Sequence, residues 1–243
     1  ILRLIISLYK KWYNKPLISD VLWMNIDYQK AQENMVESQL RPNKITNKEI
    51  LGLFNLIAKE DFLSKNDKSN AYCDLDIRLD NHRGYLKNLH IAQLLSHSEI
   101  NKNDKILHIG AMSGYVSILL SKLGREVIAI ENNEDLESVF KKNLIKFKIN
   151  NVQFYKSNFD QGYKKEAPFD LIFIDNPVYE LTKEIKDQLN MNSGKIIFIQ
   201  KIDDFLCKAY KITSIKNNLQ IKFLFDVFSK YELYKKEKSE FVF

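Results

Sequence analysis

The stretch KILHIGAMSGYVSILLSKLG, residues 105–124, decides the fold of this chain. Its apolar run up to Ile109 predicts a buried strand, and the apolar period that follows Gly114 predicts a helix. Gly110 and Gly114 flank the turn between the two, where glycine lets the backbone turn tightly and approach a ligand closely. The N-terminus of the helix also presents free N–H groups at this turn. The stretch therefore predicts a ligand-binding loop at the edge of an open α/β sheet.

The alternation of strand and helix continues toward the end of the chain. Strands are predicted at residues 105–110, 126–131, 152–157, 169–175 and 194–200, with helices at residues 114–124, 134–147 and 181–189. Because these strands are apolar on both faces, they predict a parallel sheet covered by helices on both sides.

The final strands are predicted at residues 210–216, 221–228 and 239–243. The last two have no full helix between them, and such a direct connection implies antiparallel pairing. The predicted fold class is therefore α/β: a class I methyltransferase (Rossmann-like) fold, with a doubly wound, mostly parallel sheet that ends in an antiparallel hairpin and is preceded by N-terminal helices.

Three regions are predicted along the chain. Residues 1–23 lack an initiating Met, and since Met24 is a plausible natural start, we expect them to be an upstream extension. Residues 24–100 carry helical periods and form an N-terminal helical and substrate-loop region, while residues 101–243 form the core. The first apolar run is too short to span a bilayer, and no small-residue cleavage site follows it, so we expect a cytoplasmic protein without a membrane partner.

The composition gives weaker indications. The chain has a net charge of +6, but only five of its 37 basic residues are arginines, and the lysines are dispersed among many Asn and Ile residues. This is typical of a compositional bias, so we expect no nucleic-acid partner. We also expect a monomer. Cys73 and Cys207 lie far apart and outside any C-x-x-C pattern, which favours a reducing compartment and no metal site.

Glu131 makes the loop more specific. It ends the predicted strand 126–131, 21 residues after Gly110, where an acid can accept hydrogen bonds from both hydroxyls of a ribose. The loop lacks the G-x-G-x-x-G pattern on which a pyrophosphate would rest. S-adenosylmethionine has no phosphate, so the pattern favours this methyl donor over a dinucleotide.

Several further stretches, in order along the chain, resemble the protein-L-isoaspartate (D-aspartate) O-methyltransferase family, particularly its shorter bacterial branch. The resemblance runs from about Asn34 to the last residue, and the matching stretches are residues 35–63, 106–124, 152–178, 187–199 and 224–243. It implies S-adenosyl-L-methionine as the cofactor and methyl esterification of the carboxylate of L-isoaspartyl residues. The implied role is protein repair, and the implied partners are damaged proteins or peptides.

The resemblance also implies the residues of the site. Asn158 falls where the family has an aspartate beside the adenine amino group, and an amide oxygen can accept the same hydrogen bond. The cofactor-binding residues implied are His108, Gly110, Met112, Ser113, Gly114, Glu131, Asn158 and Phe159. The substrate-facing candidates are Leu86, Asp175 and Asn176. No catalytic base is assigned, because a carboxylate with a pKa near 4 is already ionised at neutral pH.

Five positions bear on how far the family function carries over. His108 replaces the acid that should balance the cofactor's ammonium group, and Met112 stands where the family has glycine or a small residue. In the substrate loop, Leu86 replaces a serine and Asn88 a proline, and only Ala92 agrees. The departures leave two alternatives open: a non-catalytic methyltransferase-fold binding protein and a methyltransferase with another substrate. A third, more remote alternative is a nucleic-acid methyltransferase, because DNPV at residues 175–178 partly resembles a motif of amino-methylating enzymes.

Overall fold

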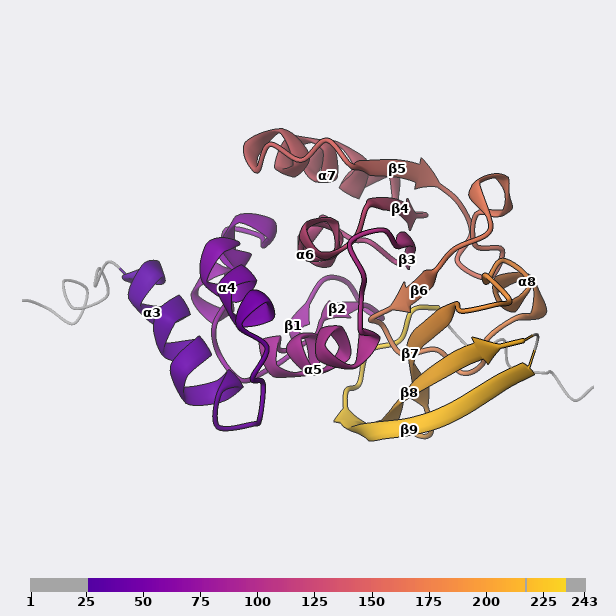
Figure 1. Cartoon of the computed structure of the whole chain (residues 1–243). Helices are drawn as coiled ribbons and strands as arrows, with labels where there is room; N and C mark the ends of the chain where they lie inside the picture. The colour runs from indigo at the N-terminus through magenta and orange to yellow at the C-terminus, as the bar shows by residue number, and fades with distance from the viewer. Residues whose placement is uncertain (1–25, 217, 235–243) are drawn as a thin grey trace, which may run out of the picture.

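The computed structural model describes residues 26–216 and 218–234, so the predictions for residues 1–23, Met24 and the strand 239–243 lie outside the described residues. A seven-stranded sheet in the order β5-β4-β3-β6-β7-β8-β9 forms its centre (Figure 1). The strands are β3 Lys105–Ile109, β4 Glu126–Glu131, β5 Val152–Lys156, β6 Leu171–Ile174, β7 Lys195–Lys201, β8 Leu206–Ile215 and β9 Asn218–Phe228. The pairs among β3 to β7 are parallel, and β7–β8 and β8–β9 are antiparallel. The predicted α/β fold class is confirmed.

Side-chain alternation along the strands divides the interior into two cores. Ile106 and Val127 belong to one core, while their neighbours Leu107 and Ile128 belong to the other. Successive residues of a strand point to opposite faces, so a strand that is apolar throughout contributes to both. The central strands could therefore be recognised as continuous apolar runs.

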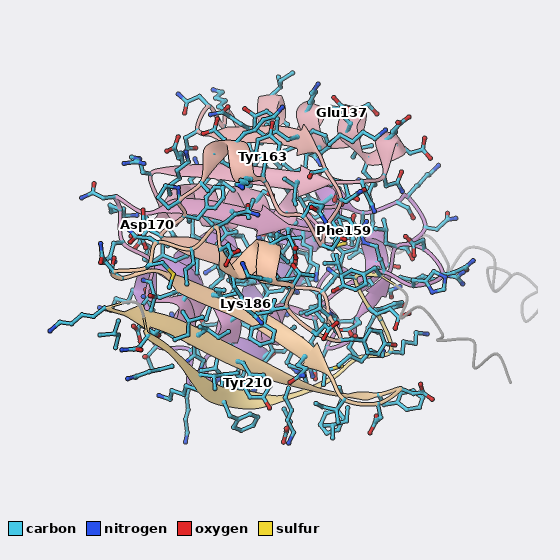
Figure 2. All side chains as sticks on the ribbon, turned by 90° about the vertical axis from the view of Figure 1, so that its right-hand side faces the viewer. Glu137, Phe159, Tyr163, Asp170, Lys186 and Tyr210 are labelled. Carbon is cyan, nitrogen blue, oxygen red and sulfur yellow. The ribbon has the colours of Figure 1, made fainter. Side chains whose placement is uncertain are left out.

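Helices cover most of one face of the sheet. The helices α5 Asn88–Ser98, α6 Tyr115–Leu123 and α7 Glu134–Lys146 lie on the left face in Figure 1. The opposite face carries α8 Lys183–Lys186 and loops. Figure 2 looks onto this second face, with Lys186 near its middle and Tyr210 of β8 below it.

The helix predicted over residues 181–189 is shorter in the structure. Thr182 caps its start by accepting a hydrogen bond from the Ile185 amide at 3.3 Å. After α8, the backbone bonds to the segment before β6: Phe169 N donates to Gln188 O at 2.9 Å, and Asn190 N donates to Phe169 O at 2.8 Å. This tertiary pairing ends the helix early, since the same backbone groups cannot also continue a helical ladder.

The N-terminal region packs on the helical face. Its helices are α3 Tyr28–Met35, continued by a π-helical turn Val36–Leu40, and α4 Lys48–Leu56, followed by the short 3-10 helices Lys59–Phe62 and Lys68–Asn70. A two-stranded hairpin, β1 Ile77–Arg78 and β2 Gly84–Tyr85, then leads to α5. One continuous apolar core joins this region to the sheet. The division of the chain at residue 100 stays a prediction.

The described residues contain neither a membrane-spanning helix nor a cluster of metal-binding side chains. No helix within residues 26–216 and 218–234 has the length and apolar character to cross a membrane. Among the same residues, no group of three or more His, Cys, Asp and Glu side chains is arranged to hold a metal ion.

Candidate active site

The glycine loop after β3 has the backbone that its sequence predicts. Gly110 has φ +82° and Gly114 has φ +96°, both in the left-handed region that favours glycine. Gly110 N donates to Ile130 O at 3.0 Å, which ties the loop to the end of β4. Met112 also has a positive φ, +50°, which is strained for a residue with a side chain. Its amide donates to Glu131 Oε2 at 2.8 Å, and this bond helps to hold the strained conformation.

The carboxylate of Glu131 lies at the centre of the site, and protein donors use both of its oxygens. Arg83 Nη1 donates to Oε1 and Arg83 Nη2 donates to Oε2, each at 2.7 Å, and both side chains are buried. The amides of Met112, Asn132 and Asn133 donate at 2.8, 3.0 and 3.0 Å. This conformation therefore leaves the carboxylate little capacity to accept hydrogen bonds from ribose hydroxyls.

Arg83, the partner of Glu131, is a residue of the candidate site that the sequence analysis did not identify. The sequence carried only a weak signal: arginine is rare in this lysine-rich chain, and its guanidinium can bind a carboxylate bidentately. The guanidinium carbon lies 5.0 Å from the centre of the Phe159 ring, a cation–π contact. Phe159 is buried beneath it. Asn158 is exposed and lines a neighbouring hollow of about 830 Å³.

The end of the described chain covers the loop. Residues 229–234, here called the C-terminal strap, cross the carboxyl ends of the central strands. Glu232 N donates to His82 O at 2.8 Å, and Leu233 N donates to Pro177 O at 2.7 Å. A Cβ placed on Gly110 would lie 2.5 Å from Leu233 Cδ1, so the strap fills the space that this glycine leaves open.

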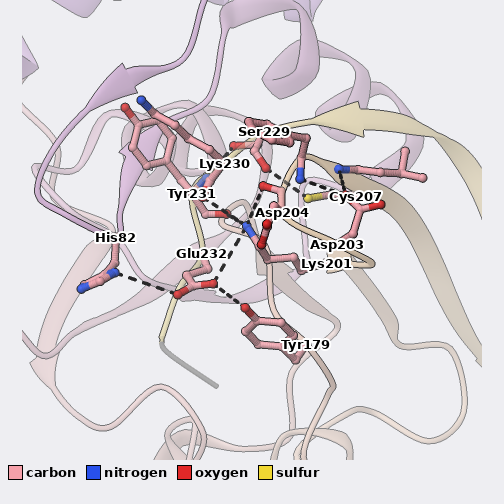
Figure 3. A network of polar contacts seen from close by, with 12 residues as sticks. His82, Tyr179, Lys201, Asp203, Asp204, Cys207, Ser229, Lys230, Tyr231 and Glu232 are labelled. Carbon is pink, nitrogen blue, oxygen red and sulfur yellow. Dashed lines mark hydrogen bonds and ion pairs between the residues drawn. The ribbon is translucent and has the colours of Figure 1, made fainter. Parts of the chain in front are cut away.

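A buried lysine anchors the strap from below. Lys201 Nζ donates to the carbonyls of Lys230 at 3.1 Å and Tyr231 at 3.3 Å (Figure 3). Tyr179 donates its hydroxyl to Glu232 Oε2 at 2.6 Å, and this hydrogen bond raises the pKa of Tyr179 to about 12. The strap is thus held by backbone and side-chain contacts at the same time.

Two of the predicted cofactor-binding residues, Ser113 and His108, hydrogen-bond to other side chains of the protein. Ser113 Oγ shares a hydrogen bond of 2.7 Å with the Tyr85 hydroxyl. His108 is fully buried, with Nδ1 2.7 Å from Ser117 Oγ and Nε2 3.2 Å from Asp175 Oδ1. His108 therefore connects the loop helix α6 to the end of β6.

The carboxyl end of β6 holds polar atoms without a protein partner. Asp175 Oδ2 and both side-chain polar atoms of Asn176 are buried and make no hydrogen bond to the described residues. Buried polar groups are normally hydrogen-bonded, so such atoms indicate a place where water or a ligand supplies the partner. The two substrate-facing candidates that follow β6 thus lie at a polar interior position.

The third substrate-facing candidate, Leu86, is buried beside a lysine that the sequence reasoning also missed. Lys59 Nζ donates to Leu86 O at 2.8 Å and lies 5.6 Å from the centre of the Tyr115 ring. Burial lowers the pKa of Lys59 to about 7, while the charges of Asp76 and Asp175 oppose the shift. A titratable amine therefore lies at the segment where the family has its substrate loop.

The comparisons with known proteins agree with the sequence motifs. Residues 30–225 match the family model described as Protein-L-isoaspartate(D-aspartate) O-methyltransferase (PCMT). This chain belongs to that family. It is 28% identical over 168 residues to the protein-L-isoaspartate O-methyltransferase of Methanoculleus marisnigri, a match that covers 69% of this chain and 76% of the relative. The protein of the same name from Petrotoga mobilis is 26% identical over 200 residues, covering 82% and 93%.

A solved structure of a protein-L-isoaspartate O-methyltransferase shares the fold, with a TM-score of 0.71 and 20% identity over 84% of this chain. The chain spans 66% of that structure's chain. The family prediction is confirmed, and the individual site roles stay predictions.

The conformation described here does not fit S-adenosylmethionine, even though the family implies it. Arg83 forms an ion pair with Glu131, the acid that is predicted to bind the ribose. Leu233 covers the backbone of Gly110. Both obstacles are side chains of this chain, and the loop beneath them keeps the left-handed glycines that a close ligand approach needs.

Substitution of either partner of the Arg83–Glu131 ion pair should lower the free energy of unfolding. Glu131→Gln leaves a buried guanidinium without its counter-charge and should lower the free energy of unfolding by about 3–5 kcal/mol. Arg83→Met leaves the carboxylate with three backbone N–H donors and should cause a clearly smaller loss. Urea unfolding of both variants checks this. Equal losses, or a larger loss for Arg83→Met, would contradict the assigned role of the backbone donors.

Because the pKa of Lys59 is lowered by burial, the stability of the fold should depend on pH. Below pH 7, Lys59 is protonated in the folded and the unfolded state, and its burial destabilises the fold by a constant amount. As pH rises above 7, the folded protein releases this proton before the unfolded chain does. Wild-type stability should therefore rise relative to Lys59→Met by up to about 1.4 kcal/mol per pH unit.

Urea unfolding of the wild type and the Lys59→Met variant between pH 6 and pH 9 measures this difference. Lys48→Met, which removes an exposed lysine of α4, is the control and should show no such trend. A pH-independent difference between wild type and Lys59→Met would show that Lys59 keeps its usual pKa.

Proposed function

We propose that this chain is an S-adenosyl-L-methionine-dependent methyltransferase that esterifies the carboxylate of L-isoaspartyl residues in damaged proteins or peptides. The observation that carries the proposal is the family match over residues 30–225, which includes the glycine loop, Glu131 and the end of β6. Open α/β sheets place ligands at the carboxyl ends of their strands, and these features gather there. We also propose that the protein acts as a monomer in the cytoplasm.

The chemistry asks little of the protein beyond binding and orientation. The acceptor carboxylate is ionised at neutral pH, so no general base is needed. The rate of such a reaction depends on holding the reacting groups in line in a dry site. Asp175 and Asn176 offer buried polar atoms there. Beside Leu86, Lys59 is an amine with a pKa of about 7, and its protonated form can attract a carboxylate.

The activity requires a second arrangement of the site. In it, Arg83 leaves Glu131 and Leu233 leaves Gly110, which frees the acid and the loop backbone. If the described arrangement is instead permanent, the chain is a non-catalytic member that keeps the fold to bind a partner. The bidentate ion pair and the covered loop favour that alternative, while the positive-φ glycines and the retained acid favour the enzyme.

A methylation assay tests the proposal. Purified protein is incubated with methyl-labelled S-adenosylmethionine and either an isoaspartyl peptide or the same peptide with ordinary aspartate. We expect an alkali-labile methyl ester on the isoaspartyl peptide alone, because the ester releases methanol in base. Asp175→Ala, which removes a polar group at the end of β6, should reduce the rate about tenfold or more.

The controls separate the alternatives. Glu137→Ala, on the exposed side of α7, should leave the rate unchanged. Labelling of another acceptor by the folded protein would replace the isoaspartyl substrate by a different one. No transfer to any peptide at millimolar donor would support the binding-protein alternative.

A further inference from the structure

We infer that Arg83 is an internal competitor for the cofactor site: its guanidinium occupies Glu131, the strap residue Leu233 closes the adjoining loop, and the cofactor must displace both. The inference rests on the proposed function, because it concerns how the cofactor of that function gains entry. It assigns a cofactor-gating role to an arginine outside the glycine loop.

The competition follows from the donors involved. A ribose presents two neighbouring hydroxyls to one carboxylate, and Arg83 presents two parallel N–H groups to the same two oxygens at 2.7 Å. Glu131 also accepts three backbone hydrogen bonds, so it has no free edge for a second bidentate donor. Ribose and guanidinium are therefore mutually exclusive at this acid.

The pair is built so that it can open. When Arg83 leaves, the amides of Met112, Asn132 and Asn133 still stabilise the charged carboxylate, so Glu131 remains ready for a new donor. The guanidinium itself is less well satisfied, because its Nε is buried without a hydrogen-bond partner among the described residues. A buried ion pair gains little net free energy after desolvation, which makes this one displaceable by a ligand.

Leu233 belongs to the same closure. The strap hydrogen-bonds to the carbonyl of His82, the residue directly before Arg83. The Tyr231 ring lies against Gly84, directly after Arg83, where an added Cβ would be 2.5 Å away. Movement of Arg83 away from Glu131 therefore disturbs these two contacts between strap and hairpin.

The closure also reaches the substrate segment. Leu86 follows Arg83 by three residues, and its carbonyl is held by Lys59. The closure is thus continuous along the chain with the segment that carries Leu86.

Competition by Arg83 and closure by Leu233 lower the fraction of molecules in the open state. A ligand that binds only the open state has an apparent dissociation constant equal to its intrinsic constant divided by the open fraction. Removing Arg83 or shortening Leu233 raises the open fraction and tightens binding without adding any contact to the ligand. Such tightening distinguishes a competitor from a residue that helps to hold the cofactor, whose loss would weaken binding.

Calorimetric titration of the full chain with S-adenosylhomocysteine is the test, because it reads binding without turnover. We expect Arg83→Met and Leu233→Ala each to lower the dissociation constant, by about tenfold or more for Arg83→Met. The matched control is Arg125→Met, which removes an arginine paired with Glu126 at 2.9 Å outside the site and should change binding by less than about twofold. Circular dichroism establishes that each variant is folded, and Arg83→Gln replaces Arg83→Met where that variant fails to fold.

The outcomes separate the inference from the function on which it rests. Measurable binding by the wild type that Arg83→Met leaves unchanged or weakens would overturn the inference and leave the proposed function standing. Tightening by Leu233→Ala alone would overturn the role of Arg83. Absence of binding in the wild type and in every folded variant at millimolar ligand would overturn the proposed function together with the inference.

Discussion

The ion pair between Arg83 and Glu131 joins the β1–β2 hairpin to the end of β4, and the arrangement of the whole carboxyl edge depends on it. The carboxylate holds the amide of Met112 in a strained backbone conformation and fixes the start of the segment that leads to α7. The guanidinium places the hairpin where the strap can hydrogen-bond to it. One buried acid therefore organises the glycine loop directly and the strap through Arg83.

The sequence predicted the parts of the fold that local pattern specifies. Each of the five parallel strands was found within a few residues of its predicted place, because strands buried on both faces are continuous apolar runs. The turn at Gly110 and Gly114 was also predictable, since its left-handed backbone nearly requires glycine. Glu131 could be located because its strand, its spacing and its charge all point to the same edge.

The closed state of the site could not be predicted in this way. Arg83 and Glu131 are 48 residues apart, and no periodicity connects a hairpin arginine to a strand-end acid. The contact of Leu233 with Gly110 joins the far end of the described chain to its central loop. The burial of Lys59 was hidden for a similar reason, because a lysine in a 3-10 turn gives no sign that other segments will cover it.

Tertiary contacts also corrected one local prediction. The period over residues 181–189 is helical, yet the helix ends at Lys186 because Gln188 and Asn190 hydrogen-bond to Phe169. In the site, tertiary contacts also change what the glycine loop and its acid imply about cofactor access. A family loop with its glycines and acid in place would suggest an open cofactor pocket from sequence alone. The side chains that cover it, from the hairpin and the strap, determine whether a cofactor can reach it.

Amide hydrogen exchange, with and without saturating S-adenosylhomocysteine, tests this account most directly. The strap amides of Glu232 and Leu233 and the loop amide of Met112 are all hydrogen-bonded in the closed state. The ligand should speed exchange in the strap while Met112 stays protected, because the strap leaves and Glu131 remains in place. Ligand binding that leaves the strap amides as protected as before would contradict it, since the cofactor would then enter without opening the site.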